Sequence, residues 1–142
     1  MKTFIYILFS IPLLSFSQLH AQGNKDLNVA VVQSIFEAFN EHNWKKMLSH
    51  YSEEAVFVDP AFDAPVSDRK VIKAHYEEIL QYFPDVKDEI VTITASGDRV
   101  VVEFVSSGTS KNGDKFRLPI CTVFTIQKGK VSRDVTYYDR TH

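Results

Sequence analysis

The chain has 142 residues and a formal net charge of −2, but its first 21 residues differ in composition from the rest. Residues 1–21 hold 13 apolar side chains against one charged side chain, Lys2. A short basic start, an apolar block and a small residue such as Ala21 are typical of a secretory signal. We therefore predict an exported protein, periplasmic or extracellular, cleaved after Ala21, with Ser17 as the alternative site.

A membrane anchor is the competing interpretation of this segment. Ser10, Pro12 and Ser15 interrupt the apolar run, which falls short of the roughly 20 residues that a spanning helix needs. We therefore expect no membrane contact after cleavage.

The remaining residues, 22–142, are enough for one domain with a single core. They carry no basic cluster, which excludes the usual electrostatic footprint of a nucleic-acid or anionic-lipid partner. Cys121 is the single cysteine of the sequence, so no internal disulfide can form, and we interpret it as a small buried side chain. We find no metal-ligand spacing, no phosphate-binding glycine loop and no nucleophile elbow, and we expect no metal and no cofactor.

Two helices are predicted first. After a polar stretch at Gln22–Asp26, apolar residues recur at helical spacing to about Glu41, and Asn43 can cap a short second helix. The apolar residues of the first helix are Val32, Ile35, Phe36 and Phe39, and those of the second are Trp44, Met47, Leu48 and Tyr51.

A short strand, Ala55–Asp59, is predicted next and ends at Pro60. Ser67 and Asp68 then open a third helix, which Pro84 ends. The buried stripe of this helix is Ile72, Tyr76, Ile79, Leu80 and Phe83.

From Val86 onward the apolar period changes to about two, and glycine-containing turns divide the chain into four strands. The predicted strands are Val86–Ser96, Arg99–Ser107, Lys115–Ile126 and Lys130–Tyr138. Short turns favour antiparallel neighbours. The sequence thus predicts an α+β cone, with three helices on one face of a curved, mainly antiparallel sheet and an apolar cavity between them.

At this point the chain resembles the NTF2-like superfamily, and most of all its SnoaL-like branch, which includes polyketide cyclases and lies near the ketosteroid isomerases. The matching motifs, in an order that spans residues 22–142, are Val31-Val32-Gln33, Tyr51 through Pro60, Phe83-Pro84-Asp85, Gly108-Thr109 with Gly113, and Gly129 through Asp139. The resemblance implies an NTF2-like cone. It does not fix a reaction, because this fold carries many functions.

The ketosteroid isomerase pattern implies a general base at Asp59. Its two oxyanion donors fall on Ile35 and on about Thr122, or Cys121 with a different gap placement. Isoleucine cannot donate a hydrogen bond, and neither residue replaces the two strong donors of that site. Steroid-type isomerisation is therefore disfavoured.

The cyclase and epoxide hydrolase branches imply pocket-facing residues on the last strand, at Ser132, Asp134, Thr136 and Tyr138. The epoxide hydrolases carry an aspartate at about Thr136, so hydrolysis of an epoxide is also disfavoured. The candidate carboxylates are Asp59 and Asp134, with Tyr138 and Thr122 as polar partners.

Structural alternatives remain open for these residues. An Asp-Pro step such as Asp59-Pro60 often only ends a strand, and a register shift of one residue would turn Asp134 towards solvent. Among the histidines, His75 is the one that could reach the pocket.

Three functions stay open. The first is a binding module for a small, largely apolar molecule, with a pocket lined by Ile35, Phe39, Phe57, Tyr76, Phe124 and Tyr138. The second is a cofactor-independent isomerase, cyclase or lyase with Asp59 as general base, helped by Asp134 or Tyr138. The third is a non-catalytic homodimer formed through the outer face of the sheet, where residues such as Val101 and Val105 lie.

Overall fold

The structure is a computed structural model that describes residues 15–139. It contains three helices and one five-stranded sheet, in the order α1, α2, β1, α3, β2, β3, β4, β5. The elements are α1 (Ser15–Asn40), α2 (Trp44–Ser49), β1 (Tyr51–Val58), α3 (Arg69–Tyr82), β2 (Lys87–Ser96), β3 (Arg99–Thr109), β4 (Lys115–Gln127) and β5 (Lys130–Tyr137).

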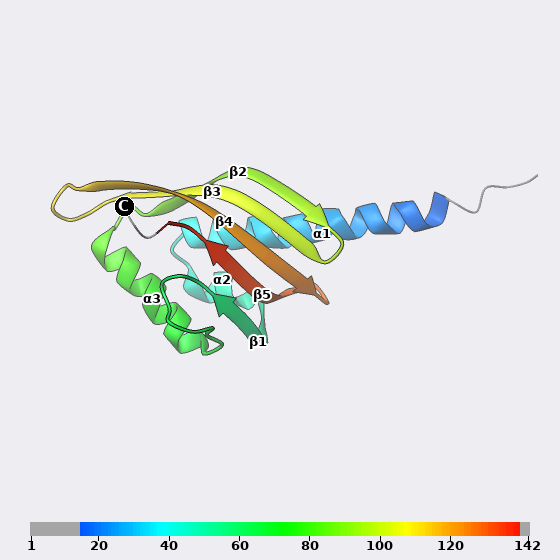
Figure 1. Ribbon diagram of the computed structural model, residues 1–142, viewed down its shortest axis with the longest axis horizontal. Helices are drawn as coiled ribbons and strands as arrows, with labels where there is room; N and C mark the ends of the chain where they lie inside the picture. Colours follow the sequence, from blue (N-terminus) through cyan, green and yellow to red (C-terminus); the bar gives the residue numbers. More distant parts are fainter. Residues whose placement is uncertain (1–14, 140–142) are drawn as a thin grey trace, which may run out of the picture.

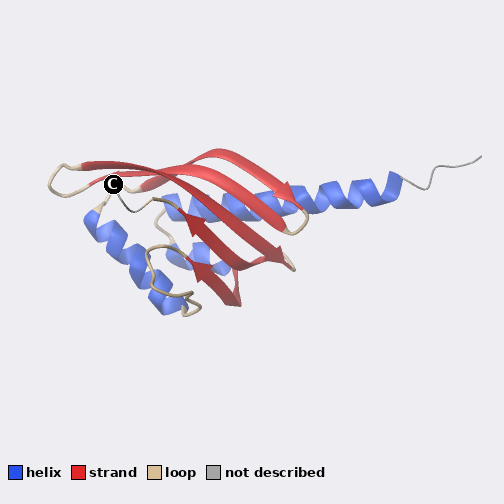
Figure 2. Cartoon of the chain, viewed as in Figure 1, coloured by secondary structure: helices blue, strands red, loops and turns tan. Residues whose placement is uncertain are grey.

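The strands form a sheet in the order β1-β5-β4-β3-β2. The three pairings among β2 to β5 are antiparallel, and β1 joins β5 in parallel, so the sheet is mixed. It is long, curved and not closed, and the helices lie on its concave side (Figures 1 and 2). This is the α+β arrangement predicted from the change of apolar period.

The predicted strand boundaries of β2 to β5 agree with the observed ones to within two residues. The turns explain this accuracy. Lys128 and Gly129 both have positive φ, of 52° and 73°, as the tight turn between β4 and β5 requires.

Two predicted boundaries in the first half of the chain are wrong. The first helix begins at Ser15, so the polar stretch Gln22–Asp26, predicted to precede it, is helical. Most of the predicted signal, residues 1–14, lies outside the described residues.

The predicted strand Ala55–Asp59 is too short at its start, because β1 already begins at Tyr51, which was assigned to the second helix. The register between β1 and β5 shifts between Tyr51 and Val56. The exposed Glu53 and Glu54 lie in this irregular part, so the alternation that reveals a strand is absent there.

Both shorter helices start where their caps predict. The Asn43 side chain accepts a hydrogen bond from the backbone N–H of Lys46, and the Asp68 side chain accepts one from that of Lys70. Each bond satisfies an N–H that the first helical turn would otherwise leave unpaired.

The core lies between α1, α2 and the concave face of the sheet. Helix α1 packs against β2, β3 and α2, whereas α3 packs against α2, and its Arg69 side chain donates hydrogen bonds to the backbone carbonyls of Tyr51 and Ser52 on β1. The fully buried core side chains are Val32, Met47, Ile72, Val86, Val100, Val102 and Val131. Tyr76 and Ile79 of α3 pack against this core.

No helix in the part of the chain that the structure describes is long and apolar enough to span a membrane.

Candidate functional site

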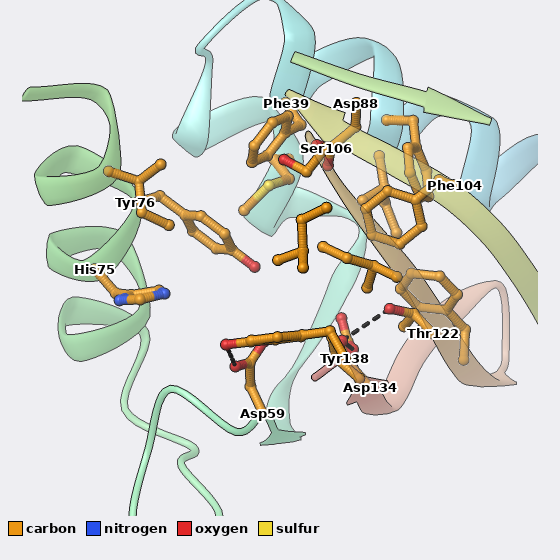
Figure 3. Close-up of a pocket in the computed structure, with 18 of the residues that line it drawn as sticks. Phe39, Asp59, His75, Tyr76, Asp88, Phe104, Ser106, Thr122, Asp134 and Tyr138 are labelled. Carbon is orange, nitrogen blue, oxygen red and sulfur yellow. Dashed lines mark hydrogen bonds between the residues drawn. The ribbon is translucent and has the colours of Figure 1, made fainter. Parts of the chain in front are cut away.

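A cavity of about 330 Å³ lies between α3, α1 and the concave face of the sheet. This volume is at the lower end of the range of small-molecule pockets. Its apolar wall is formed by Ile35, Phe36, Phe39, Met47, Ile79, Phe83, Phe104, Phe116, Leu118, Ile120 and Phe124. Its polar lining is formed by Tyr51, Asp59, His75, Tyr76, Asp88, Ser106, Thr122, Asp134, Thr136 and Tyr138. Most of its wall is therefore apolar, with three carboxyl groups set into it (Figure 3).

Asp134 lies on β5 and is 7% exposed. The Tyr51 hydroxyl donates to its Oδ2 atom at 2.8 Å, and the Thr136 hydroxyl donates to its Oδ1 atom at 3.2 Å. Thr122 and Thr136 share a further hydrogen bond of 2.8 Å. Since the Thr136 proton is used towards Asp134, Thr122 is the donor of that bond, and the three hydroxyl groups fix the orientation of the Asp134 carboxyl.

Burial raises the pKa of the Asp134 carboxyl to about 7. The hydrogen bonds from Tyr51 and Thr136 favour the charged form and work against this rise, while the nearby charge of Asp59 adds to it. A carboxyl group with this pKa can both accept and return a proton near neutral pH.

Asp59 follows β1 and lies close to Tyr138. The Tyr138 hydroxyl donates to Asp59 Oδ1 at 2.9 Å, and the backbone N–H of Ala61 donates to the same oxygen at 2.7 Å. The bond to Ala61 belongs to the turn that the Asp-Pro step predicted. Asp59 therefore closes a turn and also lines the cavity.

Helix α3 contributes Tyr76 and His75 to the cavity. The Tyr76 ring stacks on Trp44 at 5.5 Å, and Figure 3 shows its hydroxyl directed into the cavity. Burial raises the pKa of Tyr76 well above its usual value, and the charges of Asp134, Asp59 and Asp88 add to this. Its hydroxyl therefore stays protonated and can donate a hydrogen bond to a ligand.

Asp88, on β2, was missed by the sequence analysis. The Asn40 side chain holds its backbone in a reciprocal pair, since Asn40 Nδ2 donates to the Asp88 carbonyl and the Asp88 N–H donates to Asn40 Oδ1, each at 2.8 Å. The alternation of buried and exposed residues along β2 could have revealed it. Asp88 lies on the same face of the strand as Val86 and Ile90, which contribute to the core, whereas Lys87 and Glu89 are exposed.

The carboxyl of Asp88 lines the cavity opposite Ser106, its cross-strand neighbour. Burial raises the pKa of this carboxyl to about 7. A hydrogen bond with the Ser106 hydroxyl lowers the pKa, but by less than burial raises it. Its Oδ1 atom is buried and has no hydrogen-bond partner among the described residues.

The structure brings most of the predicted site residues to one cavity. The predicted residues on its wall are Ile35, Phe39, Asp59, Tyr76, Thr122, Phe124, Asp134 and Tyr138. Phe57 is not among the lining residues; it is buried behind Tyr51, whose ring stacks on it at 4.7 Å. Tyr51 thus occupies the position that was expected of Phe57.

Among residues 15–139, no group of three or more histidine, cysteine or acidic side chains is arranged to hold a metal ion.

The chain belongs to the SnoaL-like domain family, whose model matches residues 32–134. The match contains α2, β1, α3 and β2 to β4 in full, together with Asp59, Asp88 and Asp134. A comparison with curated proteins gives no significant match.

Solved structures confirm the NTF2-like fold. AclR from Streptomyces galilaeus, a protein assigned as a hydroxylase, is 21% identical, with a TM-score of 0.73 over 82% of this chain and 78% of that one. A protein from Xanthomonas campestris assigned as a polyketide cyclase is 23% identical, with a TM-score of 0.71 over 82% and 93%. A protein with a ketosteroid isomerase-like fold from Catenulispora acidiphila, solved in complex with trimethylamine, is 21% identical, with a TM-score of 0.70 over 78% and 86%.

The buried carboxyl groups make folding stability depend on pH. Asp88 releases its proton at about pH 7 in the folded state but at 3.8 when unfolded. Between these values the folded state binds more protons, so stability falls as the pH rises, by about 4 kcal/mol for this group. We predict that Asp88→Asn is more stable than the wild type at pH 8 and that the difference shrinks towards pH 4.

Urea unfolding at each pH measures this difference, with Glu89→Gln, the exposed neighbour on the same strand, as the control. A constant difference between Asp88→Asn and the wild type from pH 4 to pH 8 would contradict the prediction.

Proposed function

We propose that the protein binds a small, largely apolar molecule in the cone-shaped space between α3 and the sheet. The observation that carries this proposal is the cavity itself, about 330 Å³ with a mainly aromatic and aliphatic wall and a few convergent polar groups. The similar protein from Catenulispora acidiphila was solved with a small molecule, trimethylamine, which is consistent with ligand binding by this fold.

Filling the cavity tests this function. Leu118 points into the cavity from β4, and Arg117 beside it is exposed. We predict that N-phenylnaphthylamine, an uncharged fluorescent probe, binds the wild type and that Leu118→Trp weakens its binding about tenfold or more, because the new ring occupies the probe's volume.

Arg117→Trp is the matched control and should bind the probe as the wild type does. Equal affinity of the Leu118→Trp variant and the wild type, with both proteins folded by circular dichroism, would show that the probe does not enter this cavity.

A second candidate function is proton transfer on the bound molecule, as in a cofactor-independent isomerase, cyclase or lyase. The observation in favour of it is Asp134, a buried carboxyl with a pKa of about 7 in the same cavity as the Tyr76 hydroxyl. Asp134 would remove a proton next to a carbonyl group, and Tyr76 would donate to the oxygen that gains charge. Of the two predicted carboxylates, Asp134 is the stronger candidate base, because a carboxyl with a pKa of about 7 can both accept and return a proton near neutral pH.

Exchange of the α-protons of beta-tetralone in deuterated water tests this candidate, because exchange requires only the abstraction and return of a proton. We predict that the protein accelerates exchange and that Asp134→Asn lowers the acceleration about a hundredfold or more. Asp59→Asn should have the smaller effect, and Asp63→Asn, at an exposed position, none. If the wild type and Asp134→Asn proteins accelerate exchange equally, binding without proton transfer is the function.

The protein is also proposed to act as a homodimer through the outer face of the sheet. The helices lie on the other face (Figure 1), and Val91, Val101 and Tyr137 are exposed, by 62%, 38% and 59%. A shallow hollow on this face is lined by Val91, Glu103, Phe104, Val105, Pro119, Ile120, Cys121 and Tyr137. A second copy would cover this apolar surface. A purely structural dimer with a residual cavity is the third candidate function.

Export is proposed from the composition of residues 1–21, with a mature chain that begins at Gln22. Native mass spectrometry of the protein recovered from outside the cytoplasm tests both assembly and export. We predict a dimer of subunits that lack 21 residues, and a monomer for Val101→Lys, which places a charge in the interface. A wild-type monomer at high concentration would contradict the dimer, and a full-length subunit would contradict cleavage.

A further inference from the structure

Asp88 and Ser106 lie at one end of the cavity, and Asp59, Asp134 and Tyr138 lie at the other (Figure 3). The two ends differ in their hydrogen bonding. Asp134 receives hydrogen bonds on both carboxyl oxygens, and Asp59 receives two on one of its oxygens. The Asp88 carboxyl interacts with the Ser106 hydroxyl, but its Oδ1 atom is buried and has no hydrogen-bond partner among the described residues.

An unpartnered buried carboxyl oxygen is costly. A buried polar atom without a hydrogen bond destabilises a fold, and a buried charge without a partner destabilises it more. The fold nevertheless holds Asp88 firmly in place, because Asn40 bonds both its N–H and its carbonyl. His42 adds a second tie nearby, a hydrogen bond of 2.8 Å to the carbonyl of Val86. These bonds fix the backbone of β2 at Asp88, so the strand keeps the Asp88 side chain on the face that lines the cavity.

The charged side chains of the cavity indicate which kind of ligand could donate a hydrogen bond to Asp88 Oδ1. Three aspartates line the cavity, and its lining contains no lysine or arginine among the described residues. His75, on α3, is the one basic side chain of the lining, and it contacts Phe62 and Tyr76. An anionic ligand would be repelled by the carboxylates, whereas a cation would be attracted.

The rest of the wall suits an organic cation. Phe39, Phe104 and Phe124 are among the aromatic residues of the lining, and aromatic faces attract cations in desolvated sites. A hydroxyl group could also donate to Asp88 Oδ1. An ammonium group does more, because it donates a hydrogen bond and neutralises the buried carboxylate in the same contact.

We propose that the ligand of this cavity is an amine with an apolar body, whose protonated nitrogen donates to Asp88 Oδ1 at the Asp88–Ser106 end. The inference rests on the proposed binding function and specifies its ligand class. The apolar body extends towards Tyr76 and Asp134, so an amine bound at Asp88 leaves Asp134 free to act on the other end of the molecule.

The pKa of Asp88 supports this assignment. Burial raises it to about 7, so the empty site carries its charge only part of the time at neutral pH. A bound ammonium group favours the carboxylate and should lower this pKa. The other titratable side chains that line the cavity are Tyr76 and His75 on α3, together with Tyr51, Asp59, Asp134 and Tyr138.

Isothermal titration with three probes of one shape tests the inference. Phenethylamine is a cation at pH 7.5, phenethyl alcohol is its neutral counterpart, and phenylacetate is its anionic counterpart. We expect phenethylamine to bind about tenfold or more tighter than the alcohol, and phenylacetate to bind most weakly. We expect Asp88→Asn to weaken phenethylamine about tenfold or more and to change the alcohol by less than about threefold.

Glu89→Gln is the matched control, because it removes an exposed carboxyl from the adjacent position of the same strand and should leave all three affinities unchanged. The thermal transition of each variant confirms that it is folded. An alcohol that binds the wild type as tightly as the amine overturns the inference, and so does an amine preference that survives Asp88→Asn. An amine preference lost in Asp134→Asn but kept in Asp88→Asn would place the cation at the other end and overturn it as well.

These outcomes separate the ligand class from the binding function itself. Propylbenzene, which has no polar group, serves as the reference ligand for the cavity. Binding of propylbenzene without an amine preference contradicts the amine inference and supports the binding function. Failure of propylbenzene and all three polar probes to bind contradicts both.

Discussion

The structure depends on a balance between an apolar cavity and the carboxyl groups inside it. The curved sheet leaves a cavity under its concave face, and α3 and α1 line the other side of that cavity. Most of the cavity wall consists of aromatic and aliphatic side chains. A carboxylate in such a place loses hydration, and this loss raises the pKa of both Asp88 and Asp134 to about 7.

The two buried carboxyl groups differ in their hydrogen bonding. Asp134 is surrounded by hydroxyl donors that hold it in one orientation. Asp88 is fixed through its backbone by Asn40, and its Oδ1 atom has no partner among the described residues. In the proposed function, Asp134 is the group that would transfer a proton, and Asp88 is the group that a bound ligand would complete. Binding and proton transfer can therefore be two functions of one cavity, each dependent on a different aspartate.

Sequence reasoning reached the fold because its signals are local. Turn glycines and alternating apolar residues define β2 to β5, and the caps Asn43 and Asp68 define two helix starts. It failed at the start of β1, where an irregular register removes the alternation. In the site, Asp134 and Tyr138 followed from strand parity and family resemblance. Tyr51 did not, because its role comes from a contact with Asp134, 83 residues away in the sequence. Asp88 could have been found from the alternation of β2, where it shares the parity of Val86 and Ile90.

The structure places a hydrogen-bond donor in the cavity at a position different from those of the ketosteroid isomerase pattern. Ile35 and Thr122 lie on the cavity wall where the ketosteroid isomerase pattern has donors, and neither is a strong one. The Tyr76 hydroxyl enters the cavity from α3, a different element of the fold (Figure 3). A donor supplied by another helix is invisible to a position-by-position comparison, although the stripe of α3 had already placed Tyr76 on the buried side.

The central claim is that apolar burial sets the ionisation of the carboxyl groups in the cavity. Carbon-detected NMR of the aspartate side chains, titrated from pH 3 to pH 9, measures it directly. The carboxyl signals of Asp88 and Asp134 should each change with a midpoint near pH 7, well above the usual aspartate value of about 4. Midpoints near 4 for Asp88 and Asp134 would show that the cavity is hydrated and would contradict the account.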